Sequence, residues 1–248
     1  MTSEQVKPYD ESLSKGQQVE EMFDNIAPAY DFMNKAMTFG LHRRWLRKAL
    51  DAIGNYGKQS EKSAIVDLAT GTGDVAFDLA LRYPFAEITG IDLSEGMLTV
   101  AREKAKVRNS RITFRQGDCL NLDFPDASFD LLTIAYGVRN FENLRKGFDE
   151  FHRVLRPGGK FMILELSRPE NRLVRPGYDL YSRGLIPLVG RFVSKDNSAY
   201  SYLPKSIAAM PSRKEIARML GEAGFVDVKF KSLTLGVVTY YLGVRSEI

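Results

Sequence analysis

The chain has 248 residues, of which 44% are hydrophobic and 27% charged, so it can form a sizeable core and is neither disordered nor fibrous. Its net charge of +4 is spread along the chain without a block of like charges, which argues against a nucleic-acid-binding protein. A single cysteine, Cys119, excludes an intrachain disulfide. We therefore predict a cytoplasmic protein with no metal site, no nucleic-acid partner and no membrane-spanning helix.

The first 16 residues are polar, and we predict a flexible N-terminal arm over residues 1–16, ahead of a single domain over residues 17–248. Apolar residues then recur at three and four positions from Val19 to Ile26 and again from Leu41 to Ile53. This spacing predicts two amphipathic helices. Pro28 interrupts the first of them, because proline does not continue a helix interior.

Strand and helix patterns alternate from residue 64 to residue 165. Short apolar runs predict strands at 64–69, 87–91, 111–116, 129–136 and 160–165. The segments 74–82, 94–107 and 144–155 predict helices, and Pro157-Gly158-Gly159 predicts a turn after the last of them. Parallel strands need such helical crossovers, so the pattern predicts an α/β fold with a doubly wound, Rossmann-like, mostly parallel sheet.

The alternation ends after Ser167. Residues 168–211 are rich in Pro, Arg, Tyr and Gly, and we predict a helical insertion there, with a helical piece from Leu180 to Phe192. A helix at 212–223 and two closing strands at 226–231 and 237–244 follow. The apolar residues of 180–193, flanked by Arg183 and Arg191, would suit a bilayer surface. A lid buried on the domain or on a second subunit is the alternative.

A nucleotide-binding pattern follows the first strand. Gly71, Thr72 and Gly73 open a relaxed G-x-G-x-x-A motif, and Asp92 closes the second strand. Glycines let the backbone pass close to a ligand, and a carboxylate at that strand end accepts hydrogen bonds from ribose hydroxyls. This pattern alone fits a nicotinamide oxidoreductase as well as a methyltransferase.

Three more residues extend the candidate cofactor site. Asp118 follows the third strand, where a carboxylate can accept a hydrogen bond from an adenine amino group. Cys119 is expected to be buried, with its backbone beside the adenine. Asp67, at the end of the first strand, is either a cofactor contact or a support for the loop.

Five segments, in this order and spacing, resemble the class I methyltransferase signature. They are Asp-Leu-Ala-Thr-Gly-Thr-Gly, Gly-Ile-Asp-Leu-Ser, Gly-Asp-Cys, Phe-Asp-Leu-Leu and Leu-Arg-Pro-Gly-Gly-Lys-Phe. The resemblance implies a seven-stranded sheet whose last strand is antiparallel. It also implies S-adenosylmethionine as the cofactor, bound by Asp67, Gly71, Thr72, Gly73, Asp92, Asp118 and Cys119.

Three further segments resemble the ubiquinone and menaquinone C-methyltransferase family, and the likeness covers residues 18–245. They are Val19 to Asn34, Ile134 to Asn140, which is similar to the family motif Phe-Gly-Leu-Arg-Asn, and Tyr178 to Leu203, which is similar to a substrate-covering insertion. One departure is Ala135, where some relatives carry serine, so a side-chain hydroxyl contact is absent there.

The family implies ring-carbon methylation of demethylmenaquinol, the last step of menaquinone synthesis. Methylation of 2-methoxy-6-polyprenyl-1,4-benzoquinol in ubiquinone synthesis is the alternative, and a scaffold without catalysis is a further one. The implied partner is a prenylated quinol. Peripheral contact with the inner membrane face and a homodimer are left open.

Ring-carbon methylation needs groups that hold two reactants together, stabilise a developing phenolate and accept a proton. We expect Arg139 to stabilise the phenolate, although an ion pair that fixes a loop is its alternative. Asp74 is the candidate proton acceptor, through a water, or else a helix cap. Asn140 is expected to orient either group. Tyr30 is expected to cover the cofactor or bond the ring hydroxyl, or else to pack in the core.

Overall fold

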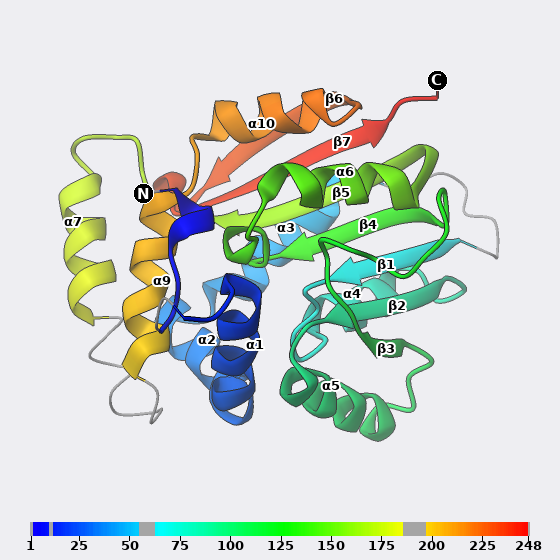
Figure 1. The fold of residues 1–248 in the computed structure, drawn as a ribbon, viewed down its shortest axis with the longest axis horizontal. Coiled ribbons are helices and arrows are strands. Elements are labelled where there is room, and N and C mark those ends of the chain that lie inside the picture. The colour runs from blue at the N-terminus through cyan, green and yellow to red at the C-terminus, as the bar shows by residue number, and fades with distance from the viewer. Residues whose placement is uncertain (1, 10–11, 55–62, 186–196, 248) are drawn as a thin grey trace.

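A seven-stranded sheet forms the centre of the computed structural model, which describes residues 2–9, 12–54, 63–185 and 197–247 (Figure 1). The strands are β1 (Ala64–Leu68), β2 (Glu87–Asp92), β3 (Thr113–Gln116), β4 (Phe129–Ala135), β5 (Leu155–Leu166), β6 (Phe225–Leu233) and β7 (Val238–Arg245). Their order is β3-β2-β1-β4-β5-β7-β6. β7 runs antiparallel to both of its neighbours, and the other neighbouring pairs are parallel. The predicted fold class is therefore confirmed, including the antiparallel last strand.

Helices cover both faces of the sheet. On one face lie α3 (Leu41–Ile53), α4 (Asp74–Arg82) and α5 (Glu95–Val107), whose apolar sides form a core with Ile65, Leu131 and Met162 of the sheet. On the other face lie α6 (Leu144–Val154) and α10 (Arg213–Glu222), which form a second core around Phe148 and Phe151. The buried positions recur at helical spacing, so hydrophobic burial holds each helix against the sheet.

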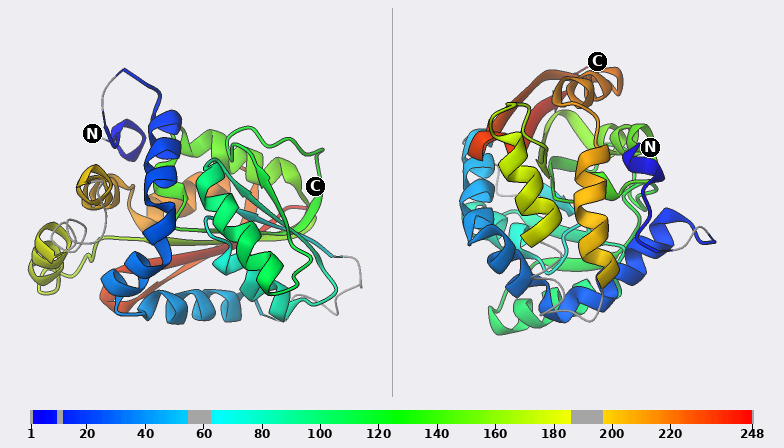
Figure 2. Two further views of the ribbon diagram at one scale, coloured as in Figure 1. Left: turned by 90° about the horizontal axis from the view of Figure 1, so that it is seen from below. Right: turned by 90° about the vertical axis from the view of Figure 1, so that its left-hand side faces the viewer.

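A cap of further helices covers the carboxyl ends of the parallel strands (Figures 1 and 2). It consists of α1 (Lys15–Ile26), α2 (Tyr30–Thr38), α7 (Arg175–Leu180) and α9 (Asn197–Ala209). A third core joins α1, α2 and α9 to Met97 of α5. The short helical turns are η1 (Ser3–Gln5), η2 (Ala27–Ala29), η3 (Val138–Asn140), η4 (Tyr181–Leu185) and η5 (Thr234–Gly236).

Two local predictions are corrected by the structure. The expected turn at Pro157-Gly158-Gly159 is part of β5, which begins at Leu155 directly after α6. Gly158 adopts a φ of +74°, and the register with β4 shifts between Phe129 and Leu131, so a β-bulge absorbs the turn. The second correction is α2, which the interruption at Pro28 concealed. Pro28 stands at the start of η2, where a missing N–H is tolerated, and the chain continues into α2.

Two other expectations fall on segments that the structure describes in part. Within the predicted arm of residues 1–16, Ser3, Val6 and Lys15 are buried against the domain; the arm's flexibility stays a prediction. Of the helical piece expected at 180–192, residues up to Leu185 continue α7 as η4, and residues 186–193 lie outside the described ranges. Among the residues that the structure describes, no helix has the length and apolar character needed to cross a bilayer.

Candidate active site

The strand order reverses between β1 and β4, and the loops after these strands part there. In open α/β sheets such a point leaves a ligand-binding crevice at the carboxyl ends of the strands. Here the crevice holds two adjoining cavities. We name the first the loop cavity, because the segments after β1, β2, β3 and β4 line it, and the second the cap cavity, because α1, α2, α7 and α9 line most of it.

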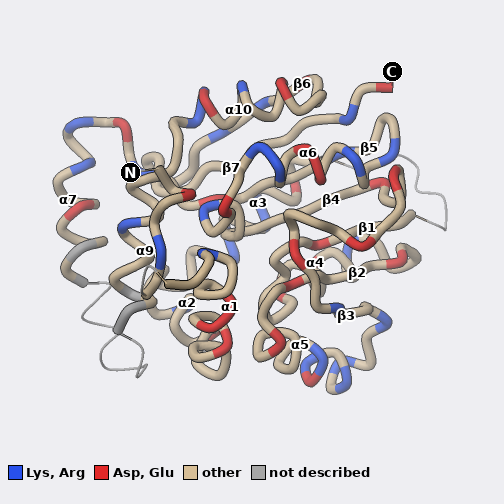
Figure 3. The backbone as a smooth tube through the Cα atoms, viewed as in Figure 1, with Lys and Arg blue, Asp and Glu red and all other residues tan. Residues whose placement is uncertain are grey.

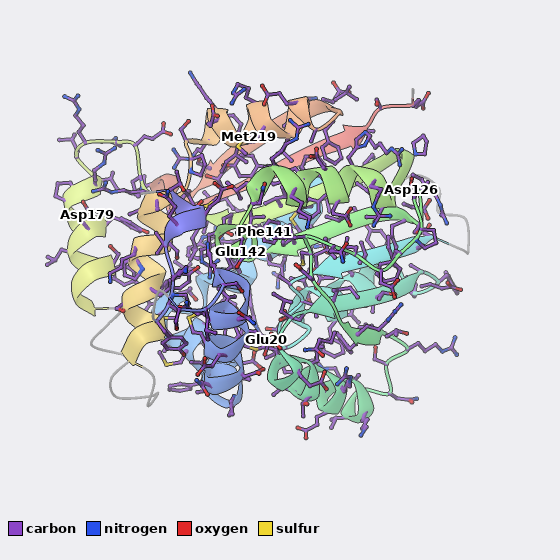
Figure 4. The ribbon with its side chains drawn as sticks, in the orientation of Figure 1. Glu20, Asp126, Phe141, Glu142, Asp179 and Met219 are labelled. Carbon is purple, nitrogen blue, oxygen red and sulfur yellow. The ribbon has the colours of Figure 1, made fainter. Side chains whose placement is uncertain are left out.

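The loop cavity has a volume of about 270 Å³. Gly71, Asp92, Asp118 and Asn140 line it from the sheet side. Glu20, in the middle of α1, lies between α1 and α5, while Phe141 and Glu142 lie beside the N-terminal end of α1 (Figure 4). The cavity therefore combines carboxylates with a glycine-lined backbone, which suits a ligand with hydroxyl and amino groups.

Asp92 ties the loop after β1 to the end of β2. Its Oδ2 accepts a hydrogen bond of 2.7 Å from the backbone N–H of Gly71, and its Oδ1 accepts one of 2.9 Å from the backbone N–H of Ser94. Gly71 adopts a φ of +55°, a backbone conformation that favours glycine. Burial raises the pKa of Asp92 to about 6, and the two backbone hydrogen bonds act in the opposite direction. Asp92 is thus a buried carboxylate at the wall of the cavity.

Asp118 and Cys119 form the neighbouring wall. Asp118 Oδ1 accepts a 2.8 Å hydrogen bond from the backbone N–H of Leu120, which fixes the turn after β3. Cys119 is buried, and burial raises the pKa of its thiol. A thiol kept protonated in this way is a weak nucleophile, in agreement with a packing role.

Asp67, Thr72 and Gly73 do not line the loop cavity. Asp67 is fully buried and accepts hydrogen bonds from the hydroxyls of Thr70 at 2.6 Å and Thr133 at 2.7 Å; burial raises its pKa to about 7. Thr72 Oγ1 donates a 2.6 Å hydrogen bond to Asp31. Gly73 precedes α4 with a φ of +87°. The structure therefore places these three residues behind the ligand-facing loop.

The cap cavity has a volume of about 120 Å³. Its walls are largely apolar and include Met22, Ile26, Met33, Met37, Trp45, Leu203, Ile207 and Val237. Five tyrosines line it as well, and Arg139 supplies the positive charge. Such a cavity suits an apolar ring with a few oxygen substituents.

Arg139 is held by a buried ion pair. Its Nη1 lies 2.9 Å from Glu165 Oε1, its backbone N–H donates to Glu165 Oε2 at 3.1 Å, and Nη1 also donates to the carbonyl of Tyr136. Burial lowers the pKa of Arg139, but the charge and hydrogen bond of Glu165, together with Tyr30 and Tyr202, outweigh burial in sum, so the pKa is raised. The guanidinium therefore stays charged. Its Nε is buried and has no hydrogen-bond partner among the described residues.

Tyr30 and Tyr136 stand where the two cavities meet, because both residues line both cavities. Burial raises the pKa of each phenol, so both are protonated donors at neutral pH. Tyr136 adopts a φ of +60°, which is strained for a tyrosine and is typical of functional positions. Its hydroxyl oxygen is buried and has no partner within the described ranges. Tyr136 was not predicted as a site residue, although its place directly after β4 was a usable signal.

Asn140 connects the two cavities. It lines the loop cavity, and its Oδ1 accepts a 3.1 Å hydrogen bond from the hydroxyl of Tyr202, which lines the cap cavity. Tyr202 and Glu165 were likewise not predicted as site residues. Glu165 had a detectable signal, since an acidic residue near the end of a core strand needs a partner. Tyr202 lies on α9, in the segment that resembles a substrate-covering insertion, so the resemblance indicated the segment but not the role of this residue.

Asp74 lies apart from this group. It lines a third cavity of about 230 Å³, which we name the side cavity, between the loop after β1 and helices α3 and α4. Its Oδ1 lies 3.1 Å from Lys104 Nζ, and the same amine lies 2.5 Å from Asp31. The structure therefore brings Arg139, Asn140 and Tyr30 together but places Asp74 outside the loop and cap cavities. Within the described ranges no group of three His, Cys, Asp or Glu side chains is placed to hold a metal ion.

Comparisons with known proteins identify the family of the chain. A family model described as the ubiE/COQ5 methyltransferase family matches residues 11–245. A protein of Porphyromonas gingivalis named demethylmenaquinone methyltransferase is 44% identical over 245 residues, which is 98% of each chain. A protein of Syntrophotalea carbinolica named ubiquinone/menaquinone biosynthesis C-methyltransferase UbiE is 42% identical, over 93% of this chain and 95% of its own.

A solved structure with the same fold is phosphoethanolamine N-methyltransferase 2 of Haemonchus contortus in complex with S-adenosyl-L-methionine. It has a TM-score of 0.60 and 17% identity, over 81% of this chain and 52% of that one. This chain thus spans about half the length of that protein. At this identity the likeness concerns the fold alone.

Proposed function

Because the chain belongs to the ubiE/COQ5 methyltransferase family, we propose that it transfers the methyl group of S-adenosylmethionine to a ring carbon of demethylmenaquinol. Relatives named demethylmenaquinone methyltransferase that match almost the whole chain support this acceptor. The observation that carries the proposal is the junction of the loop cavity with an apolar cavity that holds a buried arginine. Family membership removes the alternative of a nicotinamide oxidoreductase.

The loop cavity fits the methyl donor. Asp92 presents a buried carboxylate at the end of β2, where ribose hydroxyls would donate to it, and Gly71 leaves room for a ligand beside the backbone. Asp118 would accept a hydrogen bond from an amino group of the base. Asp67, Thr72 and Gly73 would act indirectly by fixing the loop. When bound, S-adenosylmethionine supplies a methyl group on a positively charged sulfur.

The cap cavity fits the acceptor ring. As the ring hydroxyl loses its proton, negative charge spreads from the oxygen to the neighbouring ring carbon, which makes that carbon a nucleophile. Arg139 lines this apolar cavity and stays charged, and its buried Nε–H has no hydrogen-bond partner among the described residues that would compete with a ring oxygen. The unpartnered hydroxyl of Tyr136 is a second donor at the same cavity. Donors in place before charge develops stabilise a phenolate without reorganisation.

The residues at the junction would position the two reactants. Tyr30 and Tyr136 line both cavities, so an acceptor ring bound beside them would face the loop cavity. Asn140, held by Tyr202, would fix the position of the ring or of the donor. The apolar walls of the cap cavity, once an acceptor ring fills it, would keep water away and so strengthen the electrostatic effect of Arg139. We keep Asp74 as a proton acceptor only through intervening groups, because it lines the side cavity.

An assay with both quinols tests the acceptor. We expect methyl transfer from labelled S-adenosylmethionine to demethylmenaquinol, assayed anaerobically so that the quinol stays reduced. Transfer only to 2-methoxy-6-polyprenyl-1,4-benzoquinol would move the proposal to ubiquinone synthesis, the alternative that the name of the Syntrophotalea carbinolica relative includes. The absence of transfer to either quinol would leave a scaffold without catalysis.

We further infer that the protein works in the cytoplasm, on the inner face of the membrane, where a prenylated quinol is found. The cap exposes large apolar side chains, such as Phe39, directly after α2, at 75% and Leu180, at the end of α7, at 77%. Arginines lie at the start of α7, and the two helices share the cap end of the molecule (Figures 2 and 3). Apolar groups with basic neighbours are typical of surfaces that bind anionic lipid.

Sedimentation with anionic phospholipid vesicles tests this inference. We expect the wild-type protein to sediment with the vesicles, and a Phe39→Ser/Leu180→Ser variant to stay in solution. Leu81→Ser is the control, because Leu81 is 82% exposed on α4, away from the cap. A second copy of the chain is the alternative occupant of this face. Failure of the wild-type protein to bind vesicles, together with a dimer in analytical ultracentrifugation, would favour that homodimer.

A further inference from the structure

His42 lies in the first turn of α3 and lines both the cap cavity and the side cavity. The proposed reaction releases one proton for each methyl group transferred. Arg139 remains charged and is a poor base, and Asp74 lines only the side cavity. His42 is therefore placed in the wall between the acceptor and the predicted proton acceptor.

The hydrogen bonds of His42 determine which ring nitrogen is free. Its Nδ1 lies 2.8 Å from Thr38 Oγ1. Thr38 has a single hydroxyl hydrogen, which it donates to the carbonyl oxygen of Asn34 at 2.5 Å. The Thr38 oxygen must therefore accept from His42, so Nδ1 carries the hydrogen and Nε2 keeps its lone pair. The ring is held in the tautomer that a base at Nε2 requires.

Charged groups from three helices act on this ring. Burial lowers the pKa of His42, Asp74 of α4 raises it, Arg43 of α3 lowers it and Asp31 of α2 raises it, with a net lowering. The other titratable groups of the side cavity are Tyr30, Arg47, Asp78, Arg108 and Tyr136. In the cap cavity they are Tyr30, Tyr136, Arg139, Tyr178, Tyr181 and Tyr202. His42 is thus neutral at neutral pH, with two carboxylates near enough to favour the imidazolium once it forms.

We propose that Nε2 of His42 accepts the proton of the acceptor's ring hydroxyl and releases it into the side cavity. This inference rests on the proposed function. The O–H bond breaks and its proton goes to Nε2, while the electron pair moves through the ring. The ring carbon then forms a bond to the methyl group, and the sulfur–methyl bond breaks with its electrons left on sulfur.

The ring carbon still carries its hydrogen at this stage. It loses that hydrogen as a proton while the ring oxygen gains one, and this tautomerisation restores the aromatic diol without changing the proton count. One proton per methyl group therefore leaves through His42 toward Asp74. The side cavity connects the two, because both residues line it.

His42→Gln tests the proposal against a matched control, because the chain has only two histidines. His152 packs its ring against Phe225 and lines neither the loop, the cap nor the side cavity. With both substrates saturating, we expect His42→Gln to lower kcat about a hundredfold and to flatten its decline at acidic pH. His152→Gln should change kcat less than about twofold. Neither variant should alter S-adenosylhomocysteine affinity, since neither residue lines the loop cavity.

Nitrogen-15 NMR of the histidine-labelled wild-type protein provides a test that does not depend on turnover. We expect the His42 ring to be neutral at pH 7 with its hydrogen on Nδ1, and His152→Gln assigns the signals. A ring with its hydrogen on Nε2, or an unchanged kcat and pH profile in His42→Gln, would overturn the proposal. If only the benzoquinol is methylated, the proposed function fails, and the His42 comparison is made with that acceptor. If neither quinol is methylated, the proposed function and the proposal for His42 both fail.

Discussion

The loop cavity and the cap cavity share Tyr30 and Tyr136 but are built in different ways. Hydrogen bonds that backbone N–H groups donate to Asp92 and Asp118 shape the loop cavity at the ends of successive strands. Apolar packing between helices far apart in the chain shapes the cap cavity, around one buried ion pair between Arg139 and Glu165. The loop cavity should therefore control the affinity for the methyl donor, and the cap cavity the rate of methyl transfer.

The largest effect is expected for Arg139→Gln. Removing the charge that faces the acceptor should lower kcat about 100- to 1,000-fold, while S-adenosylhomocysteine affinity changes little. Steady-state kinetics and calorimetry measure the two quantities. The variant also leaves Glu165 unpaired, which should lower the free energy of unfolding by about 3–5 kcal/mol.

Arg139→Gln/Glu165→Gln is the control for that loss of stability. It removes both charges, so it should recover much of the stability but none of the activity. A double variant that regains wild-type kcat would mean that Arg139 serves only to fix the loop, the alternative recognised from the sequence.

Asp92→Asn tests the loop cavity. Losing the charged acceptor for ribose hydroxyls should weaken S-adenosylhomocysteine binding about 10- to 100-fold, by calorimetry. The acceptor KM should stay close to the wild-type value. If Asp92→Asn weakened S-adenosylhomocysteine binding and raised the acceptor KM by the same factor, the loop cavity would not be specific for the methyl donor.

The same carboxyl predicts a pH dependence of binding. The pKa of Asp92 is raised to about 6. One unit below its pKa only about a tenth of a carboxyl is ionised, so S-adenosylhomocysteine affinity of the wild type should fall about tenfold from pH 7 to pH 5. Asp92→Asn should have a flatter profile. An affinity that rises toward pH 5 in the wild type would contradict this role.

Tyr136→Phe, at a residue that lines both cavities, should have a moderate effect on catalysis. The variant keeps the aromatic ring and removes the unpartnered hydroxyl. It has the phenylalanine with which the similar family motif Phe-Gly-Leu-Arg-Asn begins. We expect kcat/KM for the acceptor to fall about tenfold, because a hydrogen bond to a developing charge is lost. Tyr83→Phe, on a buried tyrosine at the end of α4, is the control. Equal kinetics for the two variants would remove Tyr136 from the mechanism.

The smallest effect on binding is expected for Asp67→Asn, because Asp67 lies behind the loop. S-adenosylhomocysteine affinity should change less than about threefold. The pKa of Asp67 is raised from 3.8 unfolded to about 7 folded, so the folded state holds its proton more tightly and stability falls as pH rises through this window. Denaturant unfolding at pH 5 and pH 7.5 should therefore show a smaller difference for Asp67→Asn than for the wild type.

Much of the loop cavity could be predicted from the sequence, because its residues follow strands that apolar runs reveal. Gly71, Asp92 and Asp118 each stand at a strand end, and the topology of a doubly wound sheet brings such ends together. Asp67 and Thr72 occupy the same segments, yet they face away from the cavity. A motif gives the position of a residue along the chain but not the direction of its side chain.

The cap cavity could be predicted only in part. Arg139 stood out because it follows β4, whereas Tyr202 and His42 lie on helices whose packing decides what they face. The tautomer of His42 depends on a hydroxyl of α2, a helix that the sequence did not reveal. Sites that rest on packing between distant helices leave little periodic signal.

The most direct test of the account is the position of the transferred methyl group. The wild-type protein would be incubated with carbon-13 methyl-labelled S-adenosylmethionine and reduced demethylmenaquinone, and the product examined by NMR. An acceptor ring held between Tyr30 and Tyr136, with its oxygen bonded by Arg139, predicts a label on the ring carbon beside that oxygen. A label on the oxygen, as a methyl ether, would contradict this arrangement of the two cavities.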